Sequence, residues 1–271
     1  MKSVKNFIIL ASISAVYCGG PSPCEPFASN FQAFEQAWFN LVDQYQDTIL
    51  TASSAYPVFT PALVEIFKCQ TNSAFRFVVD VISHFSGVDR FYVAEITNGN
   101  LSSESETPIG CISNDIIIMR QYIWSINVNA EHLLENSVQP ETTPNTCAEL
   151  KSRFKQFKEI GVNVSKQMGV SLNGYRIVFQ SLGIDDYLWM NNLMSQIPCL
   201  HKSVGIALGS LLNSDGSVVT QYLTGETTVL PYPFSCIESE LSFIKNNLNR
   251  RLSELYYGTI DSFDFKFGKI D

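Results

Sequence analysis

Few side chains in this sequence have the types and spacing that chemistry requires. The three histidines, His84, His132 and His201, lie far apart, and none has a second histidine at metal-ligand spacing. The sequence also lacks HExxH, GxSxG and a phosphate-binding glycine loop. We interpret the histidines as surface or capping residues. We therefore expect no enzymatic activity, no catalytic residue, no cofactor and no metal site.

Asp185 and Asp186 form a paired carboxylate, which general acid–base catalysis could use. They stand at the start of an expected helix, where acids accept hydrogen bonds from free backbone N–H groups. We therefore predict that they cap this helix. Residues 213–217, NSDGS, lack the spaced acidic ligands of a calcium loop, so we predict a turn there.

Six cysteines indicate disulfide bonds. Seven occur in the chain, without a CxxC or a Cys/His cluster, and Cys18 falls in the signal peptide predicted below. An even number in a secreted protein favours disulfides, with buried free thiols as the alternative. The six are Cys24, Cys69, Cys111, Cys147, Cys199 and Cys236.

The first residues, MKSVKNFIILASISAVYC, are typical of a secretory signal peptide. Lys2 and Lys5 precede an apolar run that is too short to span a bilayer. We predict cleavage before Gly19 and an extracellular location. A buried N-terminal helix is the alternative.

Composition limits the classes of partner. Acidic residues outnumber basic ones by 26 to 18, and 45% of residues are hydrophobic, which is enough for a packed core. Nucleic acid and anionic membranes attract concentrated positive charge, so the acidic balance disfavours both as partners. Two N-glycosylation triplets, at Asn100 and Asn163, suit a secreted glycoprotein, although the second lies inside an expected helix.

The sequence indicates an internal duplication. CEPFASNFQAF at 24–34 matches CAELKSRFKQF at 147–157, an offset of 123 residues. The later cysteines correspond at offsets of 130 and 125. Apolar residues spaced four and three apart follow both segments and predict long amphipathic helices. The stripe in the first copy is Phe27, Phe31, Phe34, Trp38, Leu41, Tyr45 and Ile49.

We therefore predict a mainly α fold made of two tandem, related, disulfide-linked repeats of about four helices each. A linker rich in proline and threonine separates them. The predicted boundaries are the signal peptide (1–18), repeat 1 (19–135), the linker (136–146), repeat 2 (147–258) and a C-terminal tail (259–271).

Short segments between the later helices could form β-hairpins. Residues 90–97, RFYVAEIT, are rich in aromatic and β-branched residues and precede Asn98-Gly99, and residues 218–223 and 227–230 flank Thr224-Gly225-Glu226. Ordered loops are an equal alternative. Alternating phenylalanines at 263, 265 and 267 suggest a terminal strand.

The helix expected after Cys111 is apolar beyond one stripe, and its additional residues are Ile117, Ile118, Tyr122 and Trp124. A helix that is apolar on most sides is usually buried on most sides. We expect it either to be the central helix between the repeats or to line a cavity for an apolar ligand.

These patterns favour a secreted protein that binds or carries a hydrophobic small molecule such as a lipid. The alternative is a secreted protein–protein interaction protein with a solid core and no small ligand. Both hypotheses rest on secretion, a disulfide-linked helical scaffold and abundant apolar residues.

Repeat symmetry restricts the disulfide pairing to one equivalent pair in each repeat and one bridge between repeats. We favour Cys69–Cys111 with Cys199–Cys236, which leaves Cys24–Cys147. The close alternative is Cys24–Cys69 with Cys147–Cys199, which leaves Cys111–Cys236.

Overall fold

All regular structure in the described part of the chain is helical. The computed structural model describes residues 24–101, 108–135, 137–138, 144 and 146–256, and no strand occurs among them. The mainly α fold predicted from the sequence is therefore confirmed. The predicted signal peptide and the tail with its alternating phenylalanines lie outside the described residues. Within the described residues, no helix combines the length and apolarity that crossing a bilayer requires.

Residues 24–135, where described, contain four α-helices. These are α1 (Glu25–Ala55), α2 (Thr60–Ser86), α3 (Arg90–Asn98) and α4 (Ser113–Glu135), with short 3-10 helices η1 (Pro57–Phe59) and η2 (Ile109–Ile112). α1 and α2 each have a proline in their first turn, where the missing N–H costs no helical hydrogen bond. The stripe predicted for α1 is buried from Phe31 to Ile49.

Residues 146–256 contain five α-helices rather than four. They are α5 (Cys147–Ser181), α6 (Asp186–Met194), α7 (Ile197–Leu212), α8 (Ser217–Thr224) and α9 (Glu238–Tyr256), with the 3-10 helix η3 (Phe234–Ile237) before α9. Thr146 caps α5, because its hydroxyl accepts a hydrogen bond from the Glu149 N–H at 3.2 Å.

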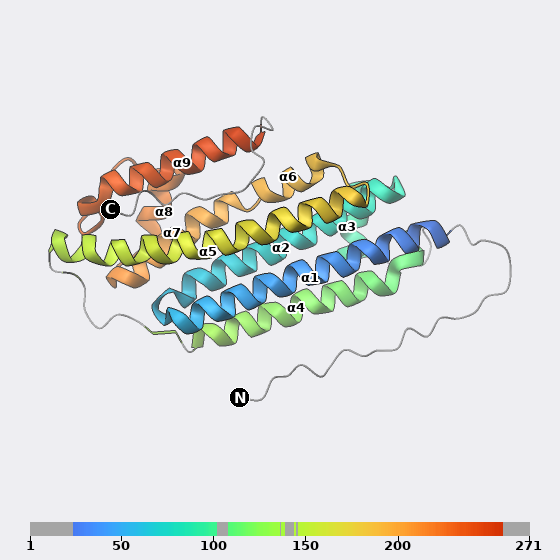
Figure 1. The fold of residues 1–271 in the computed structure, drawn as a ribbon, viewed down its shortest axis with the longest axis horizontal. Helices are drawn as coiled ribbons and strands as arrows, with labels where there is room; N and C mark the ends of the chain where they lie inside the picture. Colours follow the sequence, from blue (N-terminus) through green and yellow to red (C-terminus); the bar gives the residue numbers. More distant parts are fainter. Residues whose placement is uncertain (1–23, 102–107, 136, 139–143, 145, 257–271) are drawn as a thin grey trace.

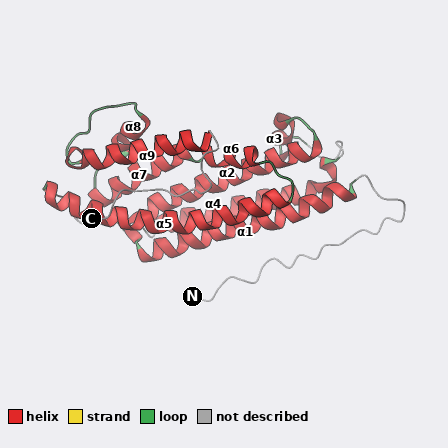
Figure 2. Cartoon of the chain, turned by 45° about the horizontal axis from the view of Figure 1, so that its top comes forward, coloured by secondary structure: helices red, strands yellow, loops and turns green. Residues whose placement is uncertain are grey.

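The long helices lie side by side along one axis (Figures 1 and 2). α1 and α4 run in one direction, while α5 and α9 run in the opposite one (Figure 1). α2 occupies the centre and contacts α1, α3, α4, α6 and α7. α4 lies at the edge of the bundle, so the expectation that it is the central helix is wrong.

Aromatic side chains from four helices join the two halves in the core. Phe34 of α1, Phe77 of α2 and Phe179 of α5 have ring centroids 5.2–5.8 Å apart, and Trp189 of α6 lies 5.5 Å from Phe77. All four side chains are buried. Such pairs stabilise beyond the area they bury, and here they fix α5 and α6 against α1 and α2.

Of the segments expected to be hairpins or ordered loops, residues 90–97 lie in the short helix α3 and residues 218–223 in the short helix α8. Residues 227–230 form neither helix nor strand. Asp89 accepts hydrogen bonds from the N–H groups of Phe91 and Tyr92, so it caps the start of α3. Gly99 ends α3 and Gly225 ends α8, both in the left-handed conformation. A hairpin turn and a helix C-cap both use glycine at positive φ, so Asn98-Gly99 is compatible with either, and here Gly99 is a helix C-cap.

Three disulfides join the six predicted cysteines: Cys24–Cys111, Cys69–Cys199 and Cys147–Cys236. Both pairings considered from the sequence are therefore wrong. The observed pairing follows from helix direction. α1 and α4 are parallel, so the cysteines that precede them lie at the same end of the bundle, and Cys147 and Cys236 likewise lie at the starts of α5 and η3.

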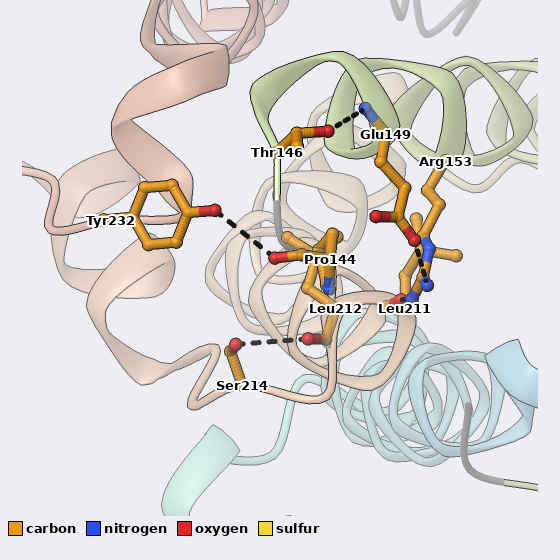
Figure 3. A network of polar contacts seen from close by, with 8 residues as sticks. All are labelled: Pro144, Thr146, Glu149, Arg153, Leu211, Leu212, Ser214 and Tyr232. Carbon is orange, nitrogen blue, oxygen red and sulfur yellow. Dashed lines mark hydrogen bonds and ion pairs between the residues drawn. The ribbon is translucent and has the colours of Figure 1, made fainter. Parts of the chain in front are cut away.

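Polar contacts hold the start of α5 against the end of α7 (Figure 3). Arg153 donates to the carbonyl oxygen of Leu211 at 3.1 Å and forms an ion pair with Glu149 at 2.8 Å. Tyr232 donates to the carbonyl oxygen of Pro144 at 3.3 Å. These bonds fix the end of the linker where α5 begins.

Candidate functional site

The four apolar residues singled out on α4 divide into two groups. Tyr122 is half-buried, its hydroxyl donates to Asp43, and its ring packs edge-on against Phe39 with centroids 5.0 Å apart. Burial, followed by the bond to Asp43, raises the pKa of Tyr122. Ile117, Ile118 and Trp124 instead point outward, with Trp124 70% exposed. All four residues are apolar, so the sequence alone did not show which of them packs against α1 and which are exposed to solvent.

Between positions 116 and 130, the outward side of α4 is uncharged and combines apolar with neutral polar side chains. We define the α4 face as the exposed residues between positions 116 and 130: Ile117, Ile118, Gln121, Trp124, Ser125 and Asn129. None of them carries a charge. An exposed apolar area without charges is typical of a binding surface.

A groove runs between α2 and α6 and is lined by two chemically different walls. We call it the α2–α6 groove. It has a volume of about 590 Å³, within the range of small-molecule sites. Tyr187, Leu188 and Met194 of α6 form the apolar wall, while Arg76 and Asp80 of α2 and Arg90 of α3 form the charged wall.

The charged wall contains one cation more than it contains anions. Arg90 pairs with Asp80, whose side chain is largely buried by this contact. Arg76 is exposed, and no described side chain forms an ion pair or hydrogen bond with it. A smaller hollow of about 280 Å³ also borders Arg76 and Ser195, and there Lys68 pairs with Glu131 and Glu65 with Lys202. Arg76 is therefore the cation of the groove whose charge is not compensated.

A buried hydrogen-bond network holds α6 on α2 beneath the groove. Ser73 donates to Asn192 at 2.5–2.8 Å, and its hydroxyl lies 2.7 Å from that of Ser195. Asn192 is only 4% exposed. Buried polar groups with satisfied partners make a site rigid, so the two walls have a defined separation.

Of the two adjacent carboxylates at the start of α6, Asp185 caps the helix as predicted, whereas Asp186 binds side chains of α5. Asp185 accepts a hydrogen bond from the Tyr187 N–H at 2.9 Å and caps the helix. Asp186 accepts hydrogen bonds from Arg176 at 3.0–3.1 Å and from Gln180 at 2.7 Å. The bond from Arg176 is the main cause that lowers the pKa of Asp186. An acid that keeps its charge in this way suits anchoring rather than proton transfer.

Another hollow lies between α7 and α8 and has polar side chains along much of its lining. It has a volume of about 760 Å³, and hydroxyl and amide side chains line most of it. Asp215 accepts bonds from the N–H and hydroxyl of Ser217, so residues 213–217 form the predicted turn. Lys202 at the edge is paired with Glu65 at 2.8 Å.

The histidines occupy two kinds of environment. His84 and His132 are exposed on helices, as predicted. His201 is buried in α7, so its expected surface position is wrong. Burial lowers the pKa of His201, and nearby Lys245 lowers it further.

Both predicted glycosylation acceptors have exposed side chains. Asn100 follows α3, and its amide donates to Glu95 at 2.9 Å, while Asn163 lies within α5. Exposure is compatible with a glycan at either position, and glycosylation stays a prediction.

Sequence reasoning did not identify the α2–α6 groove. One signal was available: Arg76 interrupts the apolar run SAFRFVVDV of α2. The apolar wall of the groove comes from residues of α6 that lie more than a hundred positions after Arg76. No local sequence pattern indicates that these two parts of the chain are close in space. Comparisons with protein-family models, with curated proteins and with solved structures find no match for this chain.

Proposed function

We propose that this protein is secreted and binds a hydrophobic small molecule in the α2–α6 groove. The apolar wall of Tyr187, Leu188 and Met194 is the observation that supports the proposal. It combines concave shape, apolar chemistry and a rigid floor, which small-molecule sites share. The binding region is therefore placed between α2 and α6, and Ile117, Ile118 and Trp124 on the α4 face are assigned to the second candidate below.

Extraction and a paired substitution test this proposal. Purified protein from its native source is extracted with organic solvent and analysed by mass spectrometry, and a lipid at stoichiometric amount is expected. Tyr187→Ser should reduce the recovered lipid, because it removes much of the apolar wall. Ile118→Ser, a similar loss of exposed apolar surface on the α4 face, should leave the amount unchanged. Equal losses in both variants would contradict the groove as the site.

The second candidate function is binding of another extracellular protein through the α4 face. Its supporting observation is the 70% exposure of Trp124 within an uncharged helix surface. Exposed tryptophan is enriched at the energetic centres of protein interfaces. A clean solvent extract, together with complex formation in native secretions that Trp124→Ser abolishes, would favour this candidate.

We further propose that the two halves arose by duplication, with repeats at 19–135 and 147–258. One disulfide lies in each proposed repeat, at corresponding positions, and the third joins Cys69 with its counterpart Cys199. Short helices that end at glycine, α3 and α8, also occupy corresponding places. An experimental structure whose halves do not superimpose would contradict this proposal.

Secretion is proposed on the predicted signal peptide, and three disulfides are compatible with an oxidising compartment. N-terminal sequencing of the extracellular protein should begin near Gly19. Digestion with a glycosidase should lower the mass if Asn100 or Asn163 carries a glycan. Secreted material that retains Met1 would contradict the assignment of the signal.

A further inference from the structure

We propose that the ligand of the α2–α6 groove is a single-chain amphiphile with one anionic head group, and that Arg76 binds this head group. This inference rests on the proposed function of the groove and specifies the class of ligand. The proposal requires an ion pair between the single negative charge of the head group and the guanidinium of Arg76.

The charges in the groove support a monoanion. Asp80 already neutralises Arg90, so Arg76 supplies the one positive charge of the groove that has no partner among the described residues. The whole chain carries a formal charge of −8. The unpaired Arg76 therefore gives this groove a local positive charge within an acidic protein. Arginine presents a planar set of donors that matches carboxylate, sulfate and phosphate oxygens.

The placement of Arg76 supports an amphiphile rather than a free anion. The guanidinium-bearing wall faces Tyr187, Leu188 and Met194 across the same groove. These wall residues span seven positions of α6, about 10 Å at 1.5 Å per residue. An acyl chain of moderate length could lie along that distance while its head group reaches Arg76. A small inorganic anion would leave the apolar wall in contact with water.

The surrounding donors allow the head group to be a carboxylate, a sulfate or a phosphate monoester. Asn191 also lines the groove and could donate a hydrogen bond to any of them. The shared chemistry is an oxyanion at the end of an apolar chain. Displacement of a bound probe by a fatty acid, an alkyl sulfate and an alkyl phosphate of the same chain length shows which of the three head groups binds most tightly.

The test compares a charged and an uncharged probe with the same chain. Binding of a pyrene-labelled fatty acid and of the matching fatty alcohol is measured by fluorescence, below the concentration at which either probe forms micelles. The intact protein should bind the acid about five- to tenfold more tightly, the range for one partly exposed charge-assisted hydrogen bond. The Arg76→Gln variant should bind both probes equally.

Two further variants make the result specific. Arg76→Lys keeps the charge and should retain part of the preference for the acid. Lys155→Gln removes an exposed cation of α5 outside the groove and should retain all of it. Circular dichroism checks that each variant is folded, and Arg76 is exposed, so loss of fold is not expected.

The outcomes separate this inference from the proposed function. If the intact protein binds acid and alcohol equally, the assignment of Arg76 is overturned, whereas binding in the groove stands. An unchanged preference for the acid in Arg76→Gln also overturns it. If neither probe nor its sulfate and phosphate analogues binds, the inference and the proposed function both fail.

Discussion

The turn between α7 and α8 leaves no room for a side chain at Gly209. A Cβ atom there would lie 2.8 Å from the backbone N of Gly216 and 2.8 Å from the backbone O of Ser214. Real Cβ atoms do not approach so closely, and backbone atoms cannot rotate away as the end of a side chain can. Gly209→Ala must therefore displace the turn that starts α8.

Gly174 provides a matched control for this change. It lies inside α5, and a Cβ atom built on it meets nothing within 4 Å. In both helices the replacement by alanine gains about 1 kcal/mol of helix propensity. Overpacking costs about 1–3 kcal/mol, so Gly209→Ala should be net destabilising by up to about 2 kcal/mol. Gly174→Ala should stabilise by about 0.5–1 kcal/mol.

Urea unfolding with all disulfides intact measures both effects. The two variants should shift the midpoint in opposite directions while the slope of the free energy against urea stays the same. In thermal unfolding, 1 kcal/mol corresponds to about 2–4 °C for a protein of this size. If Gly209→Ala stabilises the protein as much as Gly174→Ala does, the close packing of α7 and α8 described above is incorrect.

Three other perturbations test separate parts of the fold. Burial and neighbouring Asp115 raise the pKa of Glu35 to about 7. The contribution of Glu35 to the free energy of unfolding should therefore be complete below its ordinary pKa of 4.5 and be lost as the pH rises through 7. After a discount for its partial exposure, Glu35→Gln should stabilise the protein by about 1–2 kcal/mol at pH 8 and hardly at pH 4 in urea titrations. Replacement of Cys69 and Cys199, which are 130 positions apart, by alanine should cost up to about 5 kcal/mol on the chain-entropy model, and an unchanged melting temperature would contradict this. Trp38→Phe removes a buried 2.9 Å hydrogen bond from the indole N–H to a carbonyl oxygen of α2 and should cost about 1–3 kcal/mol, measured by chemical denaturation.

Long amphipathic helices were predictable because their information is local and repeated. In α1 the apolar residues from Phe31 to Ile49 recur every three or four positions, and all of them are buried in the structure. Caps were equally local. Asp185 stands at the start of α6 and bonds to an N–H two residues later, as its position before the apolar run predicts.

Short segments were harder because their local signals are ambiguous. The run RFYVAEIT contains β-formers, yet it lies in α3, where Val93 and Ile96 are buried against the bundle. Tertiary burial therefore outweighs intrinsic preference over nine residues. Similarly, the apolar residues Trp124 and Ile118 predicted that α4 is buried on most sides. Both side chains are exposed, because the helix lies at the edge of the bundle.

The candidate site depends on contacts that no sequence window contains. Arg76 and Tyr187 line the same groove only because α6 packs on α2. Ser73 and Asn192, which are 119 positions apart in the sequence, hold these two helices together by hydrogen bonding. Sequence reasoning could recognise Arg76 as an isolated cation among apolar residues. It could not determine which wall the guanidinium faces or that Asp80 is already paired with Arg90.

Helix direction explains why the cysteine pattern alone did not determine the disulfides. Cys24 and Cys111 can bond because each precedes one of two parallel helices, and parallel neighbours require a connection that returns along the bundle, here α2 and α3. Antiparallel neighbours would have favoured a bond between successive cysteines. Cys69 bonds to Cys199, on α2 and α7, which pack against each other where the halves meet. Under the proposed duplication Cys69 and Cys199 would be equivalent positions, and equivalent positions can bond only where the two halves pack against each other.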